Sequence, residues 1–397
     1  MVPQYFLVRS AAWQAEAMAN IKGTISDARF EKLGLLLSDT LDSGEDVGAS
    51  VCVTVDGETV VDIWGGHADE AQTTEWQEDT ITNVWSTTKT MTFLSALLLV
   101  ERGQLDFYAP VAQYWPEFAQ NGKENIQVRH LMGHTSGVSA WAQPVTTEDI
   151  YDWDKSTSML AAQAPWWEPG TASGYHALNQ GHLIGEVIRR IDGRMLGDFF
   201  AQEIAGPMSA DFHIGLAESQ FGRIANVIPP EDVPIDLATI DMESIAMKTF
   251  TGPAPSATTA WETSWRQACV PAANGHGNAR SVAQIQAIVA NGGTAGGVTL
   301  LSDETIDKIF DEQAHGTDMV LGLPVRFGMG YAMPSEGAPY LPEGKIAYWG
   351  GWGGSSIVVD TERNMTFAYM MNRMDAGLTG DFRSINLTTA TYDALGG

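Results

Sequence analysis

The sequence predicts a mixed α/β domain that is built from both ends of the chain and carries an inserted, mainly helical domain. Strand-forming sequence occurs near the N-terminus, at residues 49–64, and again near the C-terminus, at 356–371, with helical patterns and loops between them. The length of 397 residues also exceeds that of one typical hydrophobic core. We therefore expect residues 1–105 and 281–397 to form the α/β domain, residues 106–280 to form the helical domain, and a ligand cleft to lie between the two.

Two strand pairs justify the expected sheet. Residues 49–64 predict a β-hairpin, because two runs rich in β-branched residues flank the turn dipeptide Asp56-Gly57. Near the C-terminus, residues 356–359 and 365–371 are strand-like and are joined by a polar turn. A helix is expected over 281–291, before these C-terminal strands.

Helical periodicity marks the segments between the strands. From residue 86 to 101 the apolar residues recur at spacings of three and four, which is the period of a helix, and Gly103 ends the pattern. Leu178–Ile191 is the clearest helix of the middle segment, with its apolar residues on one face. Residues 229–260 contain several prolines and few large apolar side chains, which predicts a surface excursion.

The charge balance excludes two classes of partner. The chain has 49 acidic and 22 basic residues, a formal net charge of −27, and such a surface repels nucleic acid and anionic lipid. No segment approaches the roughly 20 unbroken apolar residues of a membrane helix, so no membrane partner is expected. The first nine residues contain only a short apolar run, unlike a signal peptide, and we expect a cytoplasmic location. The sequence leaves the oligomeric state open.

The sharpest chemical feature is a four-residue motif at the start of the helix predicted over 86–101, Ser86-Thr87-Thr88-Lys89. Residues three apart lie on the same face of a helix, so the Lys89 amine can reach the Ser86 hydroxyl. A serine hydroxyl becomes a good nucleophile when a base takes its proton, and a lysine can be that base if burial makes it neutral near pH 7. The N–H groups at the helix N-terminus favour the oxyanion that forms after attack.

Other nucleophile and cofactor motifs are absent from the sequence. The G-x-S-x-G elbow does not occur, since Gly133-His134-Thr135-Ser136-Gly137 places its serine one position too late. There is no G-x-x-x-x-G-K-S/T loop for nucleotide phosphates, and neither H-E-x-x-H nor C-x-x-C is present. The eight histidines are scattered along the chain. We expect neither a metal ion nor an organic cofactor.

Five stretches, taken together, resemble the serine β-lactamase and penicillin-binding-protein superfamily, and within it the class C-like family VIII carboxylesterases. Their order and rough spacing are similar to the family pattern, and the resemblance extends over nearly the whole chain. The five stretches are Ser86–Lys89, Arg129–Gly137, Gly174–Ala177, Asn274–Arg280 and Trp349–Ser355. The resemblance implies a β-lactamase-like fold, in which an antiparallel sheet flanked by helices carries the helical insertion.

The resemblance also implies catalytic roles. Ser86 would be the acylated nucleophile, Lys89 its proton partner, and Tyr175 the tyrosine that shares the general-base work. A tyrosinate there needs a neighbouring cation, which Lys89 would supply, and the two groups would titrate as a coupled pair. The backbone N–H groups of Ser86 and Trp352 would form the oxyanion hole, and each such donor is worth about 3 kcal/mol of barrier lowering.

Two departures from the β-lactamase pattern concern the substrate. β-Lactamases of this class carry an asparagine two residues after the tyrosine, where this chain has Ala177, and a lysine-threonine-glycine strand, where it has Trp349-Gly350-Gly351. The two glycines would let a substrate lie against the backbone of an edge strand. Loss of the amide and of the lysine charge implies neutral, apolar esters rather than anionic β-lactams.

Further aromatic and histidine residues are candidates for substrate contacts. Trp141 and Trp153 follow the stretch that contains His134, and we expect them to form the floor of an acyl pocket. His276, between two glycines, is expected to line the mouth of the cleft. His134 itself is expected to make a hydrogen-bonded loop contact.

The leading functional prediction is a carboxylesterase that acts on a small-molecule ester in two steps. The serine hydroxyl attacks the ester carbonyl and the alcohol leaves, and water then releases the acid. An acyltransferase would use the same acyl-enzyme with another alcohol or amine in place of water, and a β-lactamase or D-amino peptidase would use the same residues on an amide. A binding protein on the same fold, without catalysis, is the alternative from a different class. It predicts no covalent adduct with a fluorophosphonate probe.

Overall fold

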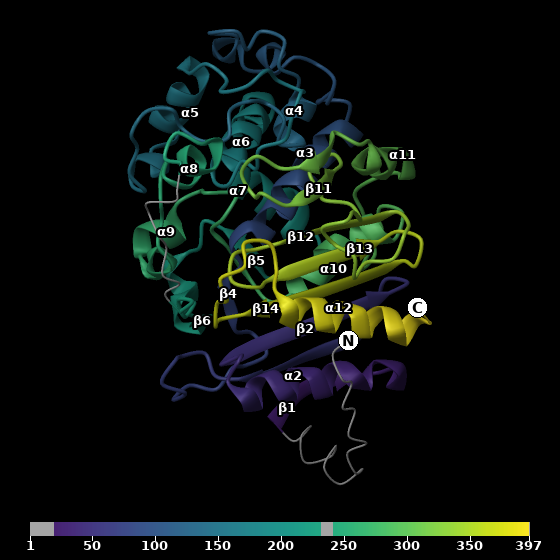
Figure 1. Ribbon diagram of the computed structural model, residues 1–397. Coiled ribbons are helices and arrows are strands. Elements are labelled where there is room, and N and C mark those ends of the chain that lie inside the picture. The colour runs from purple at the N-terminus through teal and green to yellow at the C-terminus, as the bar shows by residue number, and fades with distance from the viewer. Residues whose placement is uncertain (1–19, 232–240, 397) are drawn as a thin grey trace.

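A six-stranded antiparallel sheet, in the order β1-β3-β2-β14-β13-β12, forms the centre of one half of the molecule (Figure 1). The structure is a computed structural model and describes residues 20–231 and 241–396. The strands of this sheet are β1 (Ile21–Ile25), β2 (Gly48–Val55), β3 (Glu58–Gly66), β12 (Ile346–Gly350), β13 (Ser356–Asp360) and β14 (Met365–Met371). N-terminal and C-terminal strands thus lie in one sheet, as the sequence predicts.

The pairing of β2 with β14 joins the two ends of the chain. The two strands are antiparallel, with Met365 opposite Val55. β2 and β3 form the predicted hairpin, and its turn residues Asp56 and Gly57 have φ angles of 52° and 80°, left-handed conformations that suit aspartate and glycine. β13 and β14 form the second predicted hairpin.

Helices cover both faces of the sheet (Figure 1). α10 (Ala279–Ala290) packs on β14, β2 and β13, and the Thr366 hydroxyl of β14 donates to a carbonyl of this helix. α2 (Glu31–Ser43) and α12 (Phe382–Leu395) pack together against the other face. The side chain of Tyr369 in β14 points to this face, toward α12. Thr366 and Tyr369 point to opposite faces because side chains alternate along a strand.

Most of the remaining helices lie beyond one end of the sheet, at the top of Figure 1. α3 (Lys89–Glu101) is buried along nearly its whole length and packs on α6 (Asn179–Asp192) and α7 (Leu196–Phe200). The shorter helices are α4 (Val128–Met132), α5 (Trp153–Ala162), α8 (Ile245–Phe250), α9 (Thr263–Gln267) and α11 (Asp303–Asp307). No helix in the described part of the chain is long and apolar enough to cross a bilayer. Because α3 packs among helices of the predicted insertion, the domain boundaries at 105 and 281 stay a prediction.

A second, four-stranded sheet has the order β5-β7-β4-β6. Its strands are β4 (Ile81–Asn83), β5 (Phe212–Ile214), β6 (Ile224–Ala225) and β7 (Gly275–Gly277), and two smaller strand pairs are β8 (Thr294–Ala295) with β9 (Val298–Thr299) and β10 (Ala314–Thr317) with β11 (Pro324–Phe327). β4 ends just before Ser86, and the Val84 N–H donates to the Gly275 carbonyl at 2.9 Å. This sheet therefore fixes the path of the chain into the serine-lysine motif.

The predicted helices are present, with shifted ends. The helix predicted over 86–101 begins as a 3₁₀ turn at Trp85–Thr88 and becomes α-helical from Lys89. The helix predicted over 281–291 starts earlier, at the beginning of α10, because the Asn278 side chain caps it by accepting a backbone N–H of the first turn.

The prediction of a surface excursion over 229–260 is wrong for part of that segment. Residues 232–240 lie outside the described residues, but the part that follows forms α8 and buries Thr249. The Thr249 hydroxyl lies 2.7 Å from that of Ser139, and Ala257 is also buried. Small side chains let this segment pack closely on the helical part, so its low content of large apolar residues does not mean exposure.

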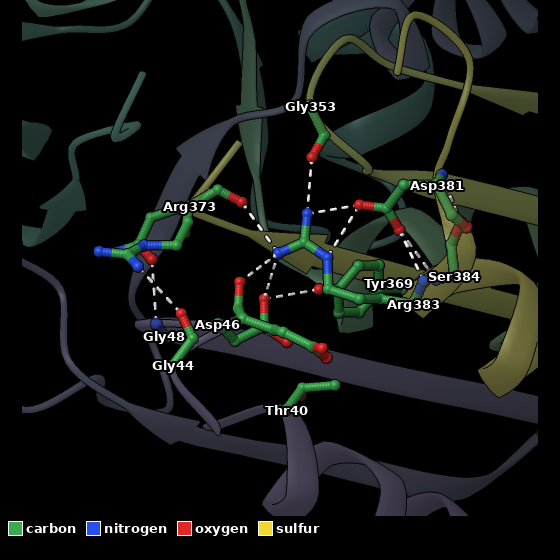
Figure 2. Close-up of polar contacts among 12 residues, drawn as sticks. Thr40, Gly44, Asp46, Gly48, Gly353, Tyr369, Arg373, Asp381, Arg383 and Ser384 are labelled. Carbon is green, nitrogen blue, oxygen red and sulfur yellow. Dashed lines mark hydrogen bonds and ion pairs between the residues drawn. The ribbon is translucent and has the colours of Figure 1, made fainter. Parts of the chain in front are cut away.

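A buried charge cluster ties α12 to the sheet and to the loop after β12 (Figure 2). The Arg383 side chain is 3% exposed and forms ion pairs with Asp46 and Asp381. It also donates to the Gly353 carbonyl, at 2.8 Å, in the loop after β12. The remaining contacts of the cluster are hydrogen bonds from Arg383 to the carbonyls of Glu45 and Arg373 and from the Tyr369 hydroxyl to Asp46. The planar fork of a guanidinium suits several acceptors at once.

Replacing Arg383 by methionine is expected to destabilise the fold by about 3–5 kcal/mol, because Asp46 and Asp381 are then buried carboxylates without a counter-charge. The shift of the denaturant midpoint measures this loss. Lys32→Met is the matched control, since Lys32 of α2 and Asp393 of α12 also form an ion pair, at 2.9 Å, but are exposed. That change should cost about 1 kcal/mol or less. Adding Asp46→Asn to Arg383→Met should recover part of the loss, and no recovery would contradict the electrostatic cause.

Candidate active site

Ser86 stands at a sharp turn between β4 and α3. The preceding residue, Trp85, has a φ angle of 47°, a left-handed conformation that is uncommon for residues other than glycine. Such a conformation needs support from its surroundings. The rings of Trp85 and Trp352, with centroids 5.0 Å apart, give part of that support. The turn places Ser86 in the lining of a pocket.

Lys89 lies one helical turn after Ser86 and is 1% exposed. Its Nζ is 3.1 Å from Ser86 Oγ, as the S-x-x-K spacing predicts. Nζ also donates to the carbonyls of Ala177, at 2.7 Å, and Ala272, at 3.0 Å. Burial lowers the pKa of Lys89 well below its usual range, and no counter-charge in the described ranges offsets this effect. The site therefore favours the neutral amine.

The Tyr175 hydroxyl donates to Ser86 Oγ at 2.7 Å, so the serine lies between a phenol and an amine. Tyr175 is 3% exposed, and Lys89 Nζ lies 4.8 Å from the centroid of its ring. Burial raises the pKa of Tyr175 and outweighs the opposite effects of Ser86 and Trp349. The structure thus brings the three predicted residues together, but burial favours a neutral phenol over a tyrosinate.

Two buried histidines hold the loop that carries Tyr175. The His176 Nδ1–H donates to the Gly174 carbonyl at 2.6 Å, and Nε2 then accepts from the Ser136 hydroxyl at 2.6 Å. The His134 Nδ1 accepts the His176 N–H at 3.0 Å, which confirms the loop hydrogen bond predicted for His134. Burial lowers the pKa of His176 to about 3, so the ring stays neutral and keeps this pattern at neutral pH.

Asp318, which sequence reasoning missed, holds the backbone of Tyr175. One carboxylate oxygen accepts three N–H groups, from Tyr175 at 3.0 Å and from Val320 and Leu321 at 2.9 Å each. Asp318 is fully buried in the loop between β10 and β11. It lies 143 positions from Tyr175 in the sequence. A single acidic residue in a loop forms no motif, so the sequence contains no signal for this contact.

The backbone N–H groups of Ser86 and Trp352 are the predicted oxyanion hole, and neither has a hydrogen-bond partner among the residues that the structure describes. The two chain segments approach each other closely. A Cβ on Gly351 would lie 2.4 Å from the Val84 carbonyl oxygen and 3.2 Å from the Ser86 nitrogen, so only glycine permits this approach. The contact brings the peptide that carries the Trp352 N–H next to the nucleophile turn.

A pocket of about 170 Å³ opens over Ser86 and Tyr175. None of the described residues that line this pocket carries a charge. Its apolar walls come mainly from Trp85, Leu178, Phe250, Pro253, Pro255, Trp352 and Leu378. Phe250, Pro253 and Pro255 lie in the segment 229–260, for which the sequence predicts a surface excursion. The sequence feature that indicates a pocket wall here is Pro253-Ala254-Pro255, a stiff apolar run without polar turn residues.

Larger hollows lie elsewhere in the described chain. A larger hollow, of about 850 Å³, lies between α2 and α12, but its lining contains no pairing of a nucleophile with a base. Size alone therefore does not identify the site. Within residues 20–231 and 241–396, no group of three or more His, Cys, Asp or Glu side chains could hold a metal ion.

The predictions that Trp141 and Trp153 form the pocket floor are wrong. The Trp141 Nε1–H donates to the Ser156 carbonyl at 3.0 Å, and the Trp153 Nε1–H donates to Glu186 at 2.7 Å. Both rings pack on His182, with centroid distances of 5.1 and 4.8 Å. A buried indole N–H needs an acceptor, and these two find theirs in the core around α5 and α6, away from the pocket.

His276, Trp349 and Gly350 also lie elsewhere than predicted. His276 is fully buried in β7, where its Nδ1–H donates to a backbone carbonyl at 2.8 Å, and it does not line the cleft mouth. Trp349 is 3% exposed and its ring packs 5.3 Å from that of Tyr175, so it supports the phenol and does not line the pocket. Gly350 ends the edge strand β12 and packs on the Thr379 carbonyl group, which a Cβ would approach to 2.5 Å.

Comparison with known proteins gives a family for this geometry. The sequence model of the Beta-lactamase family matches residues 36–390. The chain is 33% identical, over 338 residues, to the esterase/beta-lactamase LipL of Mycobacterium tuberculosis, and the match covers 82% of this chain and 77% of that protein. It is 37% identical to a family VIII carboxylesterase of known crystal structure, with a TM-score of 0.88 over 94% of this chain and 99% of that chain.

A penicillin-binding protein homologue from Caulobacter crescentus is also similar, with 33% identity and a TM-score of 0.85 over 95% of this chain and 100% of that chain. These matches include the N-terminal and C-terminal strands as well as the helical part between them. The roles of individual site residues stay a proposal. The family model matches most of the chain, and the lysine and the tyrosine both contact the serine. This chain belongs to the β-lactamase family.

Proposed function

We propose that this protein is a serine carboxylesterase that hydrolyses neutral small-molecule esters through an acyl-enzyme on Ser86. The observation that carries the proposal is the position of Ser86 Oγ, 3.1 Å from Lys89 Nζ and 2.7 Å from the Tyr175 hydroxyl, in an uncharged pocket. Two of the similar proteins are named as a family VIII carboxylesterase and as an esterase/beta-lactamase, which supports the same chemistry.

The hydrogen bonds around Lys89 fit a neutral amine, which has two N–H donors and one lone pair. The carbonyls of Ala177 and Ala272 accept both donors, which leaves the lone pair for the Ser86 hydroxyl. Lys89 is then the base that takes the Ser86 proton, and the ammonium that results keeps all three N–H groups hydrogen-bonded. The phenol of Tyr175 stays protonated and donates to Oγ.

Ester cleavage then proceeds in two halves. Ser86 Oγ bonds to the carbonyl carbon as its proton passes to Lys89 Nζ, and the N–H groups of Ser86 and Trp352 stabilise the oxyanion. When the bond to the alcohol breaks, the leaving oxygen receives that proton from Lys89 Nζ. Water then attacks the acyl-enzyme and gives one proton to the same base. Release of the acid returns this proton to Ser86 Oγ.

The lining of the pocket favours neutral substrates. No described lining residue is charged, Ala177 stands where the family pattern has an amide, and Trp349 stands where it has a lysine. Moving an anion from water into such a pocket without a counter-charge is costly. Esters with apolar acyl or alcohol groups therefore fit better than anionic β-lactams. Acyl transfer to a second alcohol would use the same acyl-enzyme and stays the alternative reaction.

Ser86→Ala is expected to abolish turnover of p-nitrophenyl esters, because it removes the nucleophile. Absorbance assays measure the rate, and intact mass after treatment with a fluorophosphonate should show one adduct on the wild type, mapped to Ser86, and none on the variant. An unchanged thermal midpoint shows that the variant is folded. Labelling of another residue, or faster turnover of nitrocefin than of the esters by the wild type, would contradict the proposal.

Lys89→Ala and Tyr175→Phe are each expected to lower kcat by about 10²–10⁴-fold, the usual range for general acid–base groups. The double variant should lose little more than the worse single variant, since the two residues act as a unit. Tyr331→Phe is the matched control, because Tyr331 is equally buried but donates to Gln286, away from the pocket. Near-full activity of Tyr175→Phe would refute its assignment.

The dependence of kcat/KM on pH should show a single acid limb. Burial lowers the pKa of Lys89 and raises that of Tyr175, so the active pair, a neutral amine and a protonated phenol, exists between the two pKa values. The rate should fall as the pH drops through the lowered Lys89 pKa and stay level above it, up to the raised pKa of Tyr175. Lys89→Arg, which keeps its charge, should be inactive at every pH. A rate that rises only near the ordinary pKa of lysine would contradict the lowered pKa of Lys89 and the neutral amine at neutral pH.

A further inference from the structure

The side chain of Ser355 connects the nucleophile turn to the loop that carries Trp352. Its hydroxyl donates to the Val84 carbonyl at 2.8 Å and lies 2.9 Å from the Thr87 hydroxyl, which therefore donates to it. Ser355 is 2% exposed and Thr87 is fully buried, so water does not compete for these bonds. One side chain thus contacts both flanks of the turn that contains Ser86.

The contact with Val84 bears on the direction of the Ser86 N–H. The Val84 carbonyl accepts both the Ser355 hydroxyl and the Thr87 N–H, the latter at 3.2 Å, which uses both of its lone pairs. Only Trp85, held in a left-handed conformation, separates this peptide from the one that carries the Ser86 N–H. Fixing the Val84 carbonyl therefore helps to fix the next peptide plane.

The backbone of Ser355 holds the other predicted donor. The Ser355 carbonyl accepts the Gly351 N–H at 2.8 Å, and the Gly351 carbonyl accepts the Gly354 N–H at 3.2 Å. The Gly351 carbonyl and the Trp352 N–H belong to one trans peptide and point in opposite directions. The Trp352 N–H is thereby directed away from its own loop. The Ser355 hydroxyl is also packed on Gly351, where a Cβ would lie 2.4 Å from Ser355 Oγ.

We propose that Ser355 is a positioning residue that sets the separation and direction of the two oxyanion donors, the N–H groups of Ser86 and Trp352. The inference rests on the proposed role of Ser86. It goes further in assigning a function to a residue that does not contact the substrate and that lies outside the pocket lining. Donors of an oxyanion hole work because they are already aimed where charge develops, so a small displacement lowers their effect on the transition state.

The experiment compares the hydrolysis of a phenyl ester with that of the corresponding thionoester, in which sulfur replaces the carbonyl oxygen. Sulfur is larger and accepts hydrogen bonds more weakly, so the thionoester gains less from the oxyanion hole. In Ser355→Ala we expect kcat on the oxygen ester to fall about 10- to 100-fold, somewhat less than on removal of a whole donor, with KM nearly unchanged. The thionoester rate should change by less than about threefold. The ratio of the oxygen-ester rate to the thionoester rate should therefore fall strongly.

Ser355→Cys supplies a second variant, which leaves no cavity because its sulfur is somewhat larger than the oxygen, and which replaces the hydroxyl with a weak donor. It should lower the ratio as Ser355→Ala does, and it answers the question if the alanine variant does not fold. Ser356→Ala is the matched control, because Ser356 is the next residue, is also buried, and starts β13 with its side chain on the opposite face. Its ratio should equal that of the wild type.

The outcomes separate this inference from the proposed function. If the wild type neither hydrolyses the esters nor becomes labelled at Ser86, the proposed function fails. If the wild type is active but a folded Ser355 variant keeps the wild-type ratio, or loses both rates equally, the positioning role is wrong. Collapse of the ratio in both Ser355 variants, but not in Ser356→Ala, supports it.

Discussion

The antiparallel pairing of β2 with β14 is the constraint on which the rest of the structure depends. It joins the two ends of the chain in one sheet, and β13 and β12 then follow in order, so that β12 becomes the edge strand beside the nucleophile turn. Through this order Ser355 and Val84, 271 positions apart, come into hydrogen-bond contact. A slip of one residue in the register would turn each strand's side chains to the other face and separate these groups.

Burial has opposite consequences at two places that share this sheet. Arg383 keeps its charge because the carboxylates of Asp46 and Asp381 lie against it. Lys89 is as deeply buried, but its partners are carbonyl and hydroxyl oxygens, with no carboxylate from the described residues among them, so burial lowers its pKa. The same burial raises the pKa of Tyr175. The presence or absence of neighbouring carboxylates therefore separates a buried arginine held in ion pairs from a buried lysine with a lowered pKa.

The two parts of the molecule contribute different elements to the site. The segments around the sheet and α3 carry the serine, the lysine and the Trp352 N–H. The helical part supplies Tyr175 and the pocket wall at 249–255. Asp318, in the loop between β10 and β11, holds the tyrosine backbone from a third segment. The pocket wall at 249–255 thus comes from a different segment than Ser86 and Lys89.

Local sequence determined the hairpins, the main helices and the pairing of Ser86 with Lys89, because strand alternation and one helical turn are short-range periodicities. Tyr175 and Trp352 could be predicted only from their resemblance to a family pattern. The positions of the other tryptophans and of His276, and the contacts of Asp318 and Ser355, were decided by the tertiary structure. The side on which a side chain is buried, and the acceptor that it finds there, depend on segments far away in the chain that only the sheet register and helix packing bring together.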